Sequence, residues 1–164
     1  MDQGPDLLAE VMGRLKKRYP VHAVIPGPSR GYLKKRLTQL GVPFSAPGFV
    51  PAHADFPVYY HALDFYLSAS RDEGGPAGIL ESMASGIPVV STRTGMATDL
   101  IQDGTSGLLC DVEDVEGLTQ KAGRLIENEA LRRSMAQAAL EMIQPYDWPT
   151  VSKRYARELY ARIR

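Results

Sequence analysis

The sequence predicts an α/β fold built on a doubly wound, mostly parallel Rossmann-like sheet that is flanked by helices. Strand patterns and helix patterns alternate along the 164-residue chain, as in parallel sheets whose strands are joined by crossover helices. Residues 87–92 show no alternation of apolar and polar side chains, which indicates a strand buried on both faces. The length fits one domain of ordinary size, with roughly five or six parallel strands.

The first helix begins at Pro5, because proline suits the first helical position, and apolar residues recur at helical spacing from Leu7 to Leu15. Pro20 stops it, and Gly41 stops the second helix, which Ser29 can cap. The strands are expected at residues 21–25, 44–50, 62–70, 87–92 and 107–110. The later helices are expected at residues 29–40, 55–60, 76–85, 99–102, 113–128, 129–143 and 147–163.

The composition excludes several classes of protein. Nineteen basic and nineteen acidic residues balance, so the chain has no net positive field for nucleic acid or for an anionic membrane surface. A single cysteine, Cys110, can form neither an intrachain disulfide nor a cysteine-rich metal site, and it is expected as a buried residue at a strand end. The sequence contains no apolar run of ~18 residues, so it predicts no transmembrane segment, and the N-terminus does not resemble a signal peptide. We therefore expect a cytoplasmic protein.

Three loops are expected to lie at one edge of the sheet. Residues 26–30, 71–76 and 93–98 each follow a predicted strand and are rich in Gly, Pro, Ser, Thr or Arg. Because ligands of open α/β sheets bind at the carboxyl ends of the strands, these loops should face one crevice.

The second loop continues into the sequence EGGPAGILE, in which two acidic residues surround a turn of small residues. Gly74 and Gly75 permit unusual backbone torsions and close approach of a ligand, and Pro76 suits the first turn of a helix. A helix start with small side chains favours phosphate, because both its free amides and its dipole attract anions. The amides are those of Gly74, Gly75, Ala77 and Gly78.

The two glutamates have a different chemistry from the turn. A carboxylate repels phosphate, so Glu73 is better suited to accept hydrogen bonds from sugar hydroxyls. Glu81 lies in the following helix, and its side chain leans back toward the helix start, where it could bind a cis-diol such as that of ribose. The same spacing is also compatible with a turn that has no binding function, in which both glutamates are solvated surface residues.

Other catalytic patterns are missing from the sequence. There is no G-x-G-x-x-G fingerprint and no phosphate loop with Gly-Lys-Ser/Thr, and no nucleophile triad stands out. His22, His53 and His61 are scattered, so each is interpreted as a strand-end or surface residue.

Four segments resemble the retaining, GT-B-type glycosyltransferases of group 1, family four, and specifically their C-terminal, donor-binding domain. Glu73 and Glu81, separated by seven residues, match the paired-glutamate motif of that family, and ESMASGIPVVST is similar to its continuation. Similar segments elsewhere are VIPGPSRGYLKKRLTQLG, VYYHALDFYLSAS and GLLCDVEDVEGL, so the resemblance covers nearly the whole chain.

The resemblance implies a role for each part of the motif. Glu81 would bind the ribose of the nucleotide, and Glu73, the candidate catalytic residue, would contact hydroxyls of the transferred sugar. The backbone of residues 74–78, from Gly74 through Gly75, Pro76 and Ala77 to Gly78, would hold the sugar and the diphosphate. Gly27 would lie beside the nucleotide, and Phe49 and Val50 near the base. The family implies no metal and no cofactor, because positive charge and a helix dipole stabilise the leaving diphosphate.

The sequence departs from the family where phosphate charge is expected. Gln3 stands in place of the usual lysine, and the usual arginine has no counterpart in the chain. Arg30 and Arg93 are the nearest alternatives for this charge. Pro76 also lacks one amide donor, and Gly95-Met96 replaces a usual Gly-Gly pair.

We therefore expect the nucleotide-sugar donor-binding half of a hexosyltransferase whose N-terminal acceptor domain is absent from the chain, and which is inactive when isolated. Two alternatives remain open: a module that binds nucleotide-sugars without turnover, and an α/β domain for protein interactions. The last helix carries an apolar stripe through Trp148, Val151, Tyr155, Leu159 and Ile163. That stripe should pack on its own domain or, if exposed, favour self-association.

Overall fold

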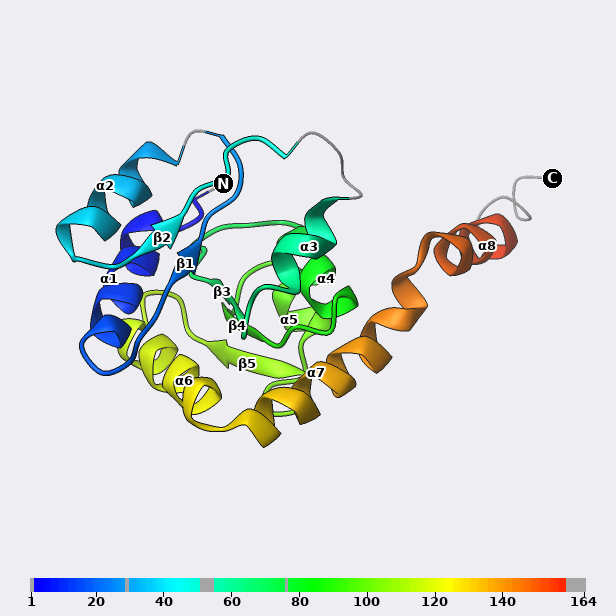
Figure 1. Ribbon diagram of the computed structural model, residues 1–164. Coiled ribbons are helices and arrows are strands. Elements are labelled where there is room, and N and C mark those ends of the chain that lie inside the picture. The colour runs from blue at the N-terminus through cyan, green and yellow to red at the C-terminus, as the bar shows by residue number, and fades with distance from the viewer. Residues whose placement is uncertain (1, 29, 51–54, 76, 159–164) are drawn as a thin grey trace.

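The computed structural model describes residues 2–28, 30–50, 55–75 and 77–158, and in them strands and helices alternate before a helical C-terminal part (Figure 1). The strands are β1 (Ala23–Val24), β2 (Phe44–Ser45), β3 (Tyr66–Ser68), β4 (Val89–Thr92) and β5 (Gly107–Cys110). The helices are α1 (Pro5–Lys16), α2 (Gly31–Gln39), α3 (Phe56–Tyr60), α4 (Ala77–Ala84), α5 (Ala97–Leu100), α6 (Val115–Glu127), α7 (Glu129–Ile143), the 3-10 turn η2 (Gln144–Tyr146) and α8 (Trp148–Glu158).

Helices cover both faces of the strands, which confirms the doubly wound α/β fold. On one face, residues of α1, α2 and α6 form a core cluster with Val90 and Leu108. On the other face, residues of α4, α5 and α7 form a second cluster with Val89 and Leu109. Neighbouring residues of a strand point to opposite faces, so β4 and β5 supply both clusters and are buried at every position.

The strands form two sheets rather than the single sheet that we expected. Three strands pair in the order β3-β4-β5, and β1 pairs only with β2; each of these pairs is parallel. The strands before β4 are also shorter than predicted. β1 covers two residues of the predicted 21–25, and β3 covers three of the predicted 62–70.

The other element predictions agree with the structure to within a few residues. The helix over residues 129–143 and the strand over residues 107–110 begin and end where they were predicted. Cys110 is buried at the end of β5, and this burial raises the pKa of its thiol to about 11. Ser29, the predicted cap of α2, lies outside the described residues.

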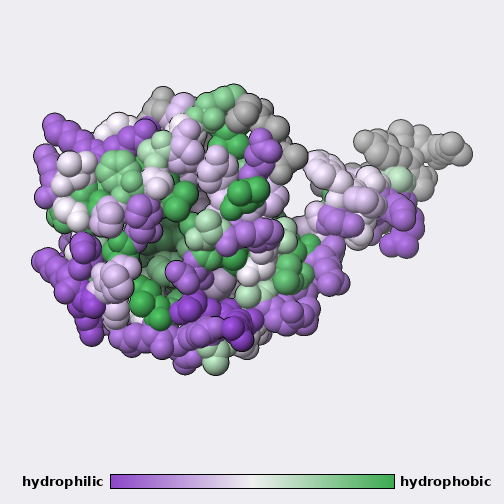
Figure 2. Space-filling model, in the orientation of Figure 1, coloured by the Kyte–Doolittle hydropathy of each residue, from purple (hydrophilic) through white to green (hydrophobic). Residues whose placement is uncertain are grey.

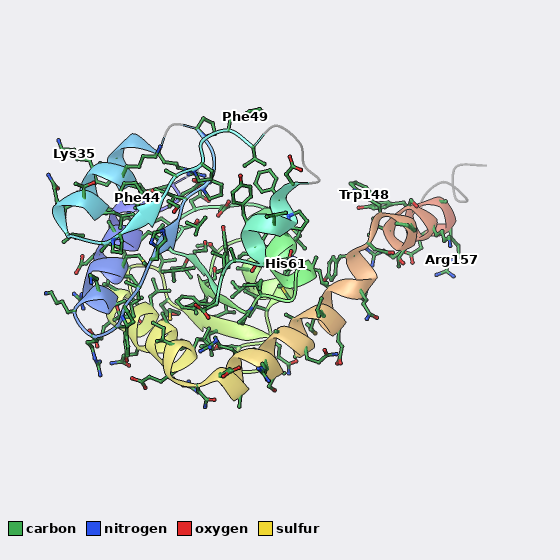
Figure 3. The ribbon with its side chains drawn as sticks, viewed as in Figure 1. Lys35, Phe44, Phe49, His61, Trp148 and Arg157 are labelled. Carbon is green, nitrogen blue, oxygen red and sulfur yellow. The ribbon has the colours of Figure 1, made fainter. Side chains whose placement is uncertain are left out.

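The last helix, α8, projects away from the domain instead of packing on it (Figure 1). None of its described residues is buried, and Trp148, the first residue of the helix, is 82% exposed (Figure 3). The expectation that this helix packs on its own domain is therefore wrong, and Trp148 and Tyr155 of the apolar stripe are exposed, whereas Val151 is half-buried. Leu159 and Ile163 lie outside the described residues.

The N-terminal segment is fixed to the end of β3 by close contacts and by one arginine. Gly4 adopts a φ of 56°, and a Cβ atom there would lie 2.0 Å from the carbonyl oxygen of Ala69, so only glycine fits. Arg71 donates two hydrogen bonds of 2.7 Å to Asp6 and also binds Glu113, so it joins α1 to the loop after β5. Within the described residues, no helix is long and apolar enough to cross a membrane.

The Asp6–Arg71 pair predicts a pH-dependent contribution to stability. Hydrogen bonds from Arg71 lower the pKa of Asp6 to about 2, whereas an aspartate in the unfolded chain has a pKa of about 3.9. The pair therefore stabilises the fold fully above pH ~4, and this contribution is lost as the pH falls toward about 2. Asp6→Asn should lower the free energy of unfolding above pH ~4 and should have little effect near pH ~2, as measured by urea unfolding across this range.

The control for this measurement is Asp6→Asn in an Arg71→Gln background. There the pH-dependent difference should disappear, because the partner that lowers the pKa is gone. A difference that persists unchanged in that background would contradict the assignment.

Candidate functional site

The candidate site is built on the parallel pairing of β3 and β4. Ser68, the last residue of β3, is the partner of Ser91, and β4 ends one residue later at Thr92, so the loops that follow leave the sheet side by side. The hydroxyl of Thr92 donates to the carbonyl of Ser70 at 2.6 Å, which fixes the start of the loop after β3. The hydroxyl of Ser70 in turn donates to Oε2 of Glu73 at 2.7 Å. The carboxylate of Glu73 is therefore held at the carboxyl end of the sheet.

The loop after β4 lies directly against the loop after β3. Gly95 adopts a φ of 46°, and a Cβ atom there would lie 1.8 Å from the carbonyl oxygen of Glu73 and 3.0 Å from that of Gly74. No side chain fits in this contact. Gly75 faces the sulfur of Met96, which would lie 3.6 Å from a Cβ atom at that glycine. The predicted meeting of these two loops is thus observed.

The second glutamate is held by a tyrosine. The hydroxyl of Tyr60, at the end of α3, donates to Oε2 of Glu81 at 2.7 Å. That hydroxyl also lies 3.5 Å from the Cβ position of Gly78, in the first turn of α4, so the carboxylate of Glu81 lies back toward the helix start. Burial and the Glu81 carboxylate raise the pKa of Tyr60, so it remains a hydrogen-bond donor at neutral pH.

A second tyrosine, Tyr66 of β3, packs beside the first turn of α4. A Cβ atom at Gly78 would lie 2.4 Å from the Tyr66 hydroxyl, so glycine is required there. The rings of Tyr60 and Tyr66 are 6.0 Å apart. Burial raises the pKa of Tyr66 to about 12; the Glu73 and Glu81 carboxylates add to the shift, and the Arg30 guanidinium opposes it. The Tyr66 hydroxyl thus lies beside the first turn of the helix whose Glu81 is bound by Tyr60.

The loops after β1 and β2 form the other wall of this end of the molecule. Gly27, with a φ of 98°, donates its amide to the carbonyl of Gly48 at 2.8 Å, which joins the two loops. Phe49 follows and is 75% exposed; Figure 3 shows it projecting from the same end of the molecule. Val50 is buried, so its side chain is not open to a ligand.

The two candidate arginines differ in their surroundings. Arg30 is exposed and donates to the side-chain oxygen of Gln3 at 2.5 Å, so it reaches the position where the resembling family has lysine. Arg93 instead binds Asp103 at 2.7 Å and lies 3.6 Å from Asp111. Its charge is already compensated, and the structure favours Arg30 for an incoming anion.

The sequence analysis did not identify the groups that hold the glutamates. Tyr60 and Tyr66 lie in the segment VYYHALDFYLSAS, but the sequence does not indicate whether Tyr59 or Tyr60 binds Glu81. The sequence likewise does not predict the hydrogen bond from Ser70 to Glu73. Pro76 lies outside the described residues. Ala77 and Gly78 open α4 at the predicted place.

In the described part of the chain, no group of three or more His, Cys, Asp or Glu side chains is placed to hold a metal ion. His22 binds the hydroxyl of Ser45 at the outer sheet, and His61 is an exposed residue after α3. His53 lies outside the described residues.

Comparison with solved structures defines the class of protein. The fold is that of the C-terminal half of a GT-B glycosyltransferase. It matches the C-terminal domain of the glycosyl transferase group 1 family protein LpcC from Francisella tularensis with a TM-score of 0.79 and 27% identity, over 89% of this chain and 80% of that one. Anabaena HepE matches with a TM-score of 0.86 and 24% identity, over 97% of this chain and 45% of that one.

Sequence comparison then gives the family. Residues 2–142 match the family of glycosyl transferases group 1, and the chain belongs to it. A D-inositol 3-phosphate glycosyltransferase of Corynebacterium urealyticum is 29% identical over 98% of this chain and 40% of its own length. Sulfoquinovosyl transferase SQD2 of Arabidopsis thaliana is 29% identical over 98% of this chain and 31% of its own. The chain thus spans less than half the length of these two relatives.

The contact between the two loops gives a testable prediction. Gly95→Ala should force residues 73–75 away from the end of β4 and strain a positive φ, so it should lower the free energy of unfolding by about 1–3 kcal/mol. Urea unfolding measures this loss. The matched control is Gly74→Ala, because a Cβ atom at Gly74 meets nothing within 4 Å. Equal unfolding midpoints for the two variants would refute the close contact.

Proposed function

We propose that this chain is the donor-binding part of a retaining glycosyltransferase that transfers a hexosyl group from a nucleotide diphosphate sugar to an acceptor. The observation that carries the proposal is the small-residue start of α4, where the Tyr60 hydroxyl that binds Glu81 lies beside Gly78, next to the loop in which Ser70 binds Glu73. An acceptor-binding domain is the partner that completes the enzyme, and without it this domain binds the donor but does not transfer the sugar.

The chemistry of the site supports a donor of this kind. The start of α4 offers backbone amides and the positive end of a helix dipole beside small side chains, an environment suited to a diphosphate. Glu81, held by Tyr60, can accept hydrogen bonds from the ribose hydroxyls. Glu73, held by Ser70, can accept them from the transferred sugar and is the proposed catalytic residue. Gly27, Phe49 and the Val50 backbone line the side proposed for the nucleoside.

The names of relatives support sugar transfer without selecting one sugar. One relative is a lipopolysaccharide core biosynthesis mannosyltransferase of Rhizobium meliloti, 29% identical over 98% of this chain. Another is an N-acetyl-alpha-D-glucosaminyl L-malate synthase of Bacillus anthracis, 38% identical over 49% of this chain. Because these names include different hexosyl groups, the proposal stays at the level of a hexosyl donor. It includes no metal: Arg30 and the helix dipole stabilise the leaving diphosphate.

A second function is favoured by one specific residue. Gln3 stands where the resembling family has a phosphate-binding lysine, and the loss of a cation would weaken stabilisation of the leaving group more than binding. A nucleotide-sugar-binding module without turnover is therefore the alternative. Joining the chain to an acceptor domain and measuring transfer would separate the two, because only an enzyme part would gain activity.

The roles of the two glutamates predict different responses to substitution. Glu81→Gln should weaken the binding of a nucleoside diphosphate and of its sugar conjugate by the same factor, roughly tenfold or more, because a charge-assisted bond contributes about 1.5–3 kcal/mol. Glu73→Gln should weaken only the sugar conjugate. Calorimetry with UDP, GDP and ADP and with their glucose conjugates measures both effects.

The control for this experiment is Glu141→Gln, which removes an exposed carboxylate on α7 and should leave every affinity unchanged. If Glu73→Gln weakened the free nucleotide as much as the sugar nucleotide, the division of roles would be wrong. Absence of binding to all six ligands would overturn the proposed function.

The position of Arg30 predicts which part of the donor it contacts. Arg30→Gln should lower affinity for a nucleoside diphosphate roughly tenfold and should not change affinity for the nucleoside, because the guanidinium would bind only the phosphates. Gln3→Lys should raise affinity for the diphosphate. Arg36→Gln, an exposed site on α2, is the matched control. Equal losses for diphosphate and nucleoside would contradict a phosphate role for Arg30.

A further inference from the structure

The hydroxyl of Tyr66 is a polar group to which the described part of the domain offers no partner. Tyr66 is the first residue of β3, and its ring packs against the core cluster on the α4 side of the sheet. Among the described residues its hydroxyl makes no hydrogen bond, whereas the hydroxyl of the neighbouring Tyr60 donates to Glu81. A phenol at the edge of a core usually finds a hydrogen-bond partner. The partner of Tyr66 is therefore to be sought in a ligand.

The Tyr66 hydroxyl is open to such a ligand. In the described residues every fully buried polar side-chain atom has a hydrogen-bond partner, so a hydroxyl without one is in contact with solvent. Tyr66 as a whole is half-buried. It also borders an apolar groove of about 460 Å³ between β1 and β3, which Figure 2 shows as a hollow on this face of the molecule. A ligand atom can therefore approach the hydroxyl.

The position of the hydroxyl relates it to one part of the site. A Cβ atom on Gly78 would lie 2.4 Å from the Tyr66 hydroxyl and 3.5 Å from the Tyr60 hydroxyl, so the two phenols take the space of a side chain at this residue. Gly78 and Glu81 are three residues apart and share one side of α4. The Tyr66 hydroxyl thus lies on the side of the helix that carries Glu81, close to the helix start.

We propose that the Tyr66 hydroxyl donates a hydrogen bond to the phosphate that is attached to the ribose of the donor. This inference rests on the proposed function, in which amides at the start of α4 bind the diphosphate and Glu81 binds the ribose. Gly78 lies between those two parts of the helix. A hydroxyl beside Gly78 faces the atoms that join the ribose to the diphosphate, and these are the oxygens of the first phosphate.

A neutral phenol is suited to this contact. Burial raises the pKa of Tyr66 to about 12, so the hydroxyl keeps its proton at neutral pH and can donate it to an anion. Gly78 is needed because any side chain there would displace the hydroxyl. The alternative is a hydroxyl that contacts only water, and in that case phenylalanine would serve equally well.

The test is Tyr66→Phe, which removes the hydroxyl and keeps the ring. Because the hydroxyl makes no hydrogen bond within the described domain, urea unfolding without ligand should give the same free energy for the variant and the parent chain. Calorimetry then measures the affinity for uridine, UMP and UDP and for the corresponding guanosine and adenosine compounds. Tyr146→Phe, which alters an exposed phenol after α7, is the matched control.

Tyr66→Phe should bind the monophosphate and the diphosphate of the preferred nucleoside roughly tenfold more weakly and the nucleoside with unchanged affinity. Tyr60→Phe gives a contrasting pattern. It should weaken nucleoside, monophosphate and diphosphate by one common factor, because it removes the group that orients Glu81 toward the ribose. The two patterns distinguish a phosphate contact from a general disturbance of the site.

Three results would overturn the inference and leave the proposed function intact. The first is equal affinity of Tyr66→Phe and the parent chain for the monophosphate and the diphosphate. The second is an equal loss for the nucleoside, which would place the hydroxyl at the ribose or the base. The third is a loss for the diphosphate alone, which would place it at the second phosphate. If the parent chain bound none of these compounds, the proposed function would fail and this inference with it.

Discussion

The contact of Gly95 with the backbone of Glu73 is the constraint on which the candidate site depends. It holds the loop after β4 against the loop after β3 with no room for a side chain, just beyond the pairing of Ser68 with Ser91. The Thr92 hydroxyl reinforces it by binding Ser70. Because this backbone is held from both sides, Glu73 keeps a fixed position relative to the start of α4. A ligand would therefore lose little binding free energy in ordering the site.

Hydroxyl groups determine how the two acidic side chains are oriented. Ser70 and Tyr60 each donate one hydrogen bond to a glutamate, which fixes the direction of each carboxylate. Burial and the nearby carboxylates keep Tyr66 protonated. Arg30 supplies the opposing positive charge from a different loop. The site therefore combines acceptors suited to hydroxyls with a cation and amides suited to an anion.

Two apolar surfaces of this domain are left without partners among the described residues. One is the groove between β1 and β3, and the other is α8, which carries the exposed Trp148 beyond the body of the domain. Exposed apolar surfaces of this kind favour association with a partner.

The sequence alone determined the fold class, because alternation of elements and unbroken apolar strands allow few architectures. It also located the acidic pair, the small-residue helix start and the long helix from Glu129 to Ile143, whose signals are local. Only the tertiary structure decided that the sheet is divided, that Tyr60 and Ser70 hold the glutamates, and that Arg30 rather than Arg93 is open to an anion. Each of these depends on contacts between residues that are distant in sequence, and the identity of one residue does not specify which distant residue it contacts. The direction of α8 was undetermined for the same reason, since an apolar stripe specifies that a surface should be covered but not what covers it.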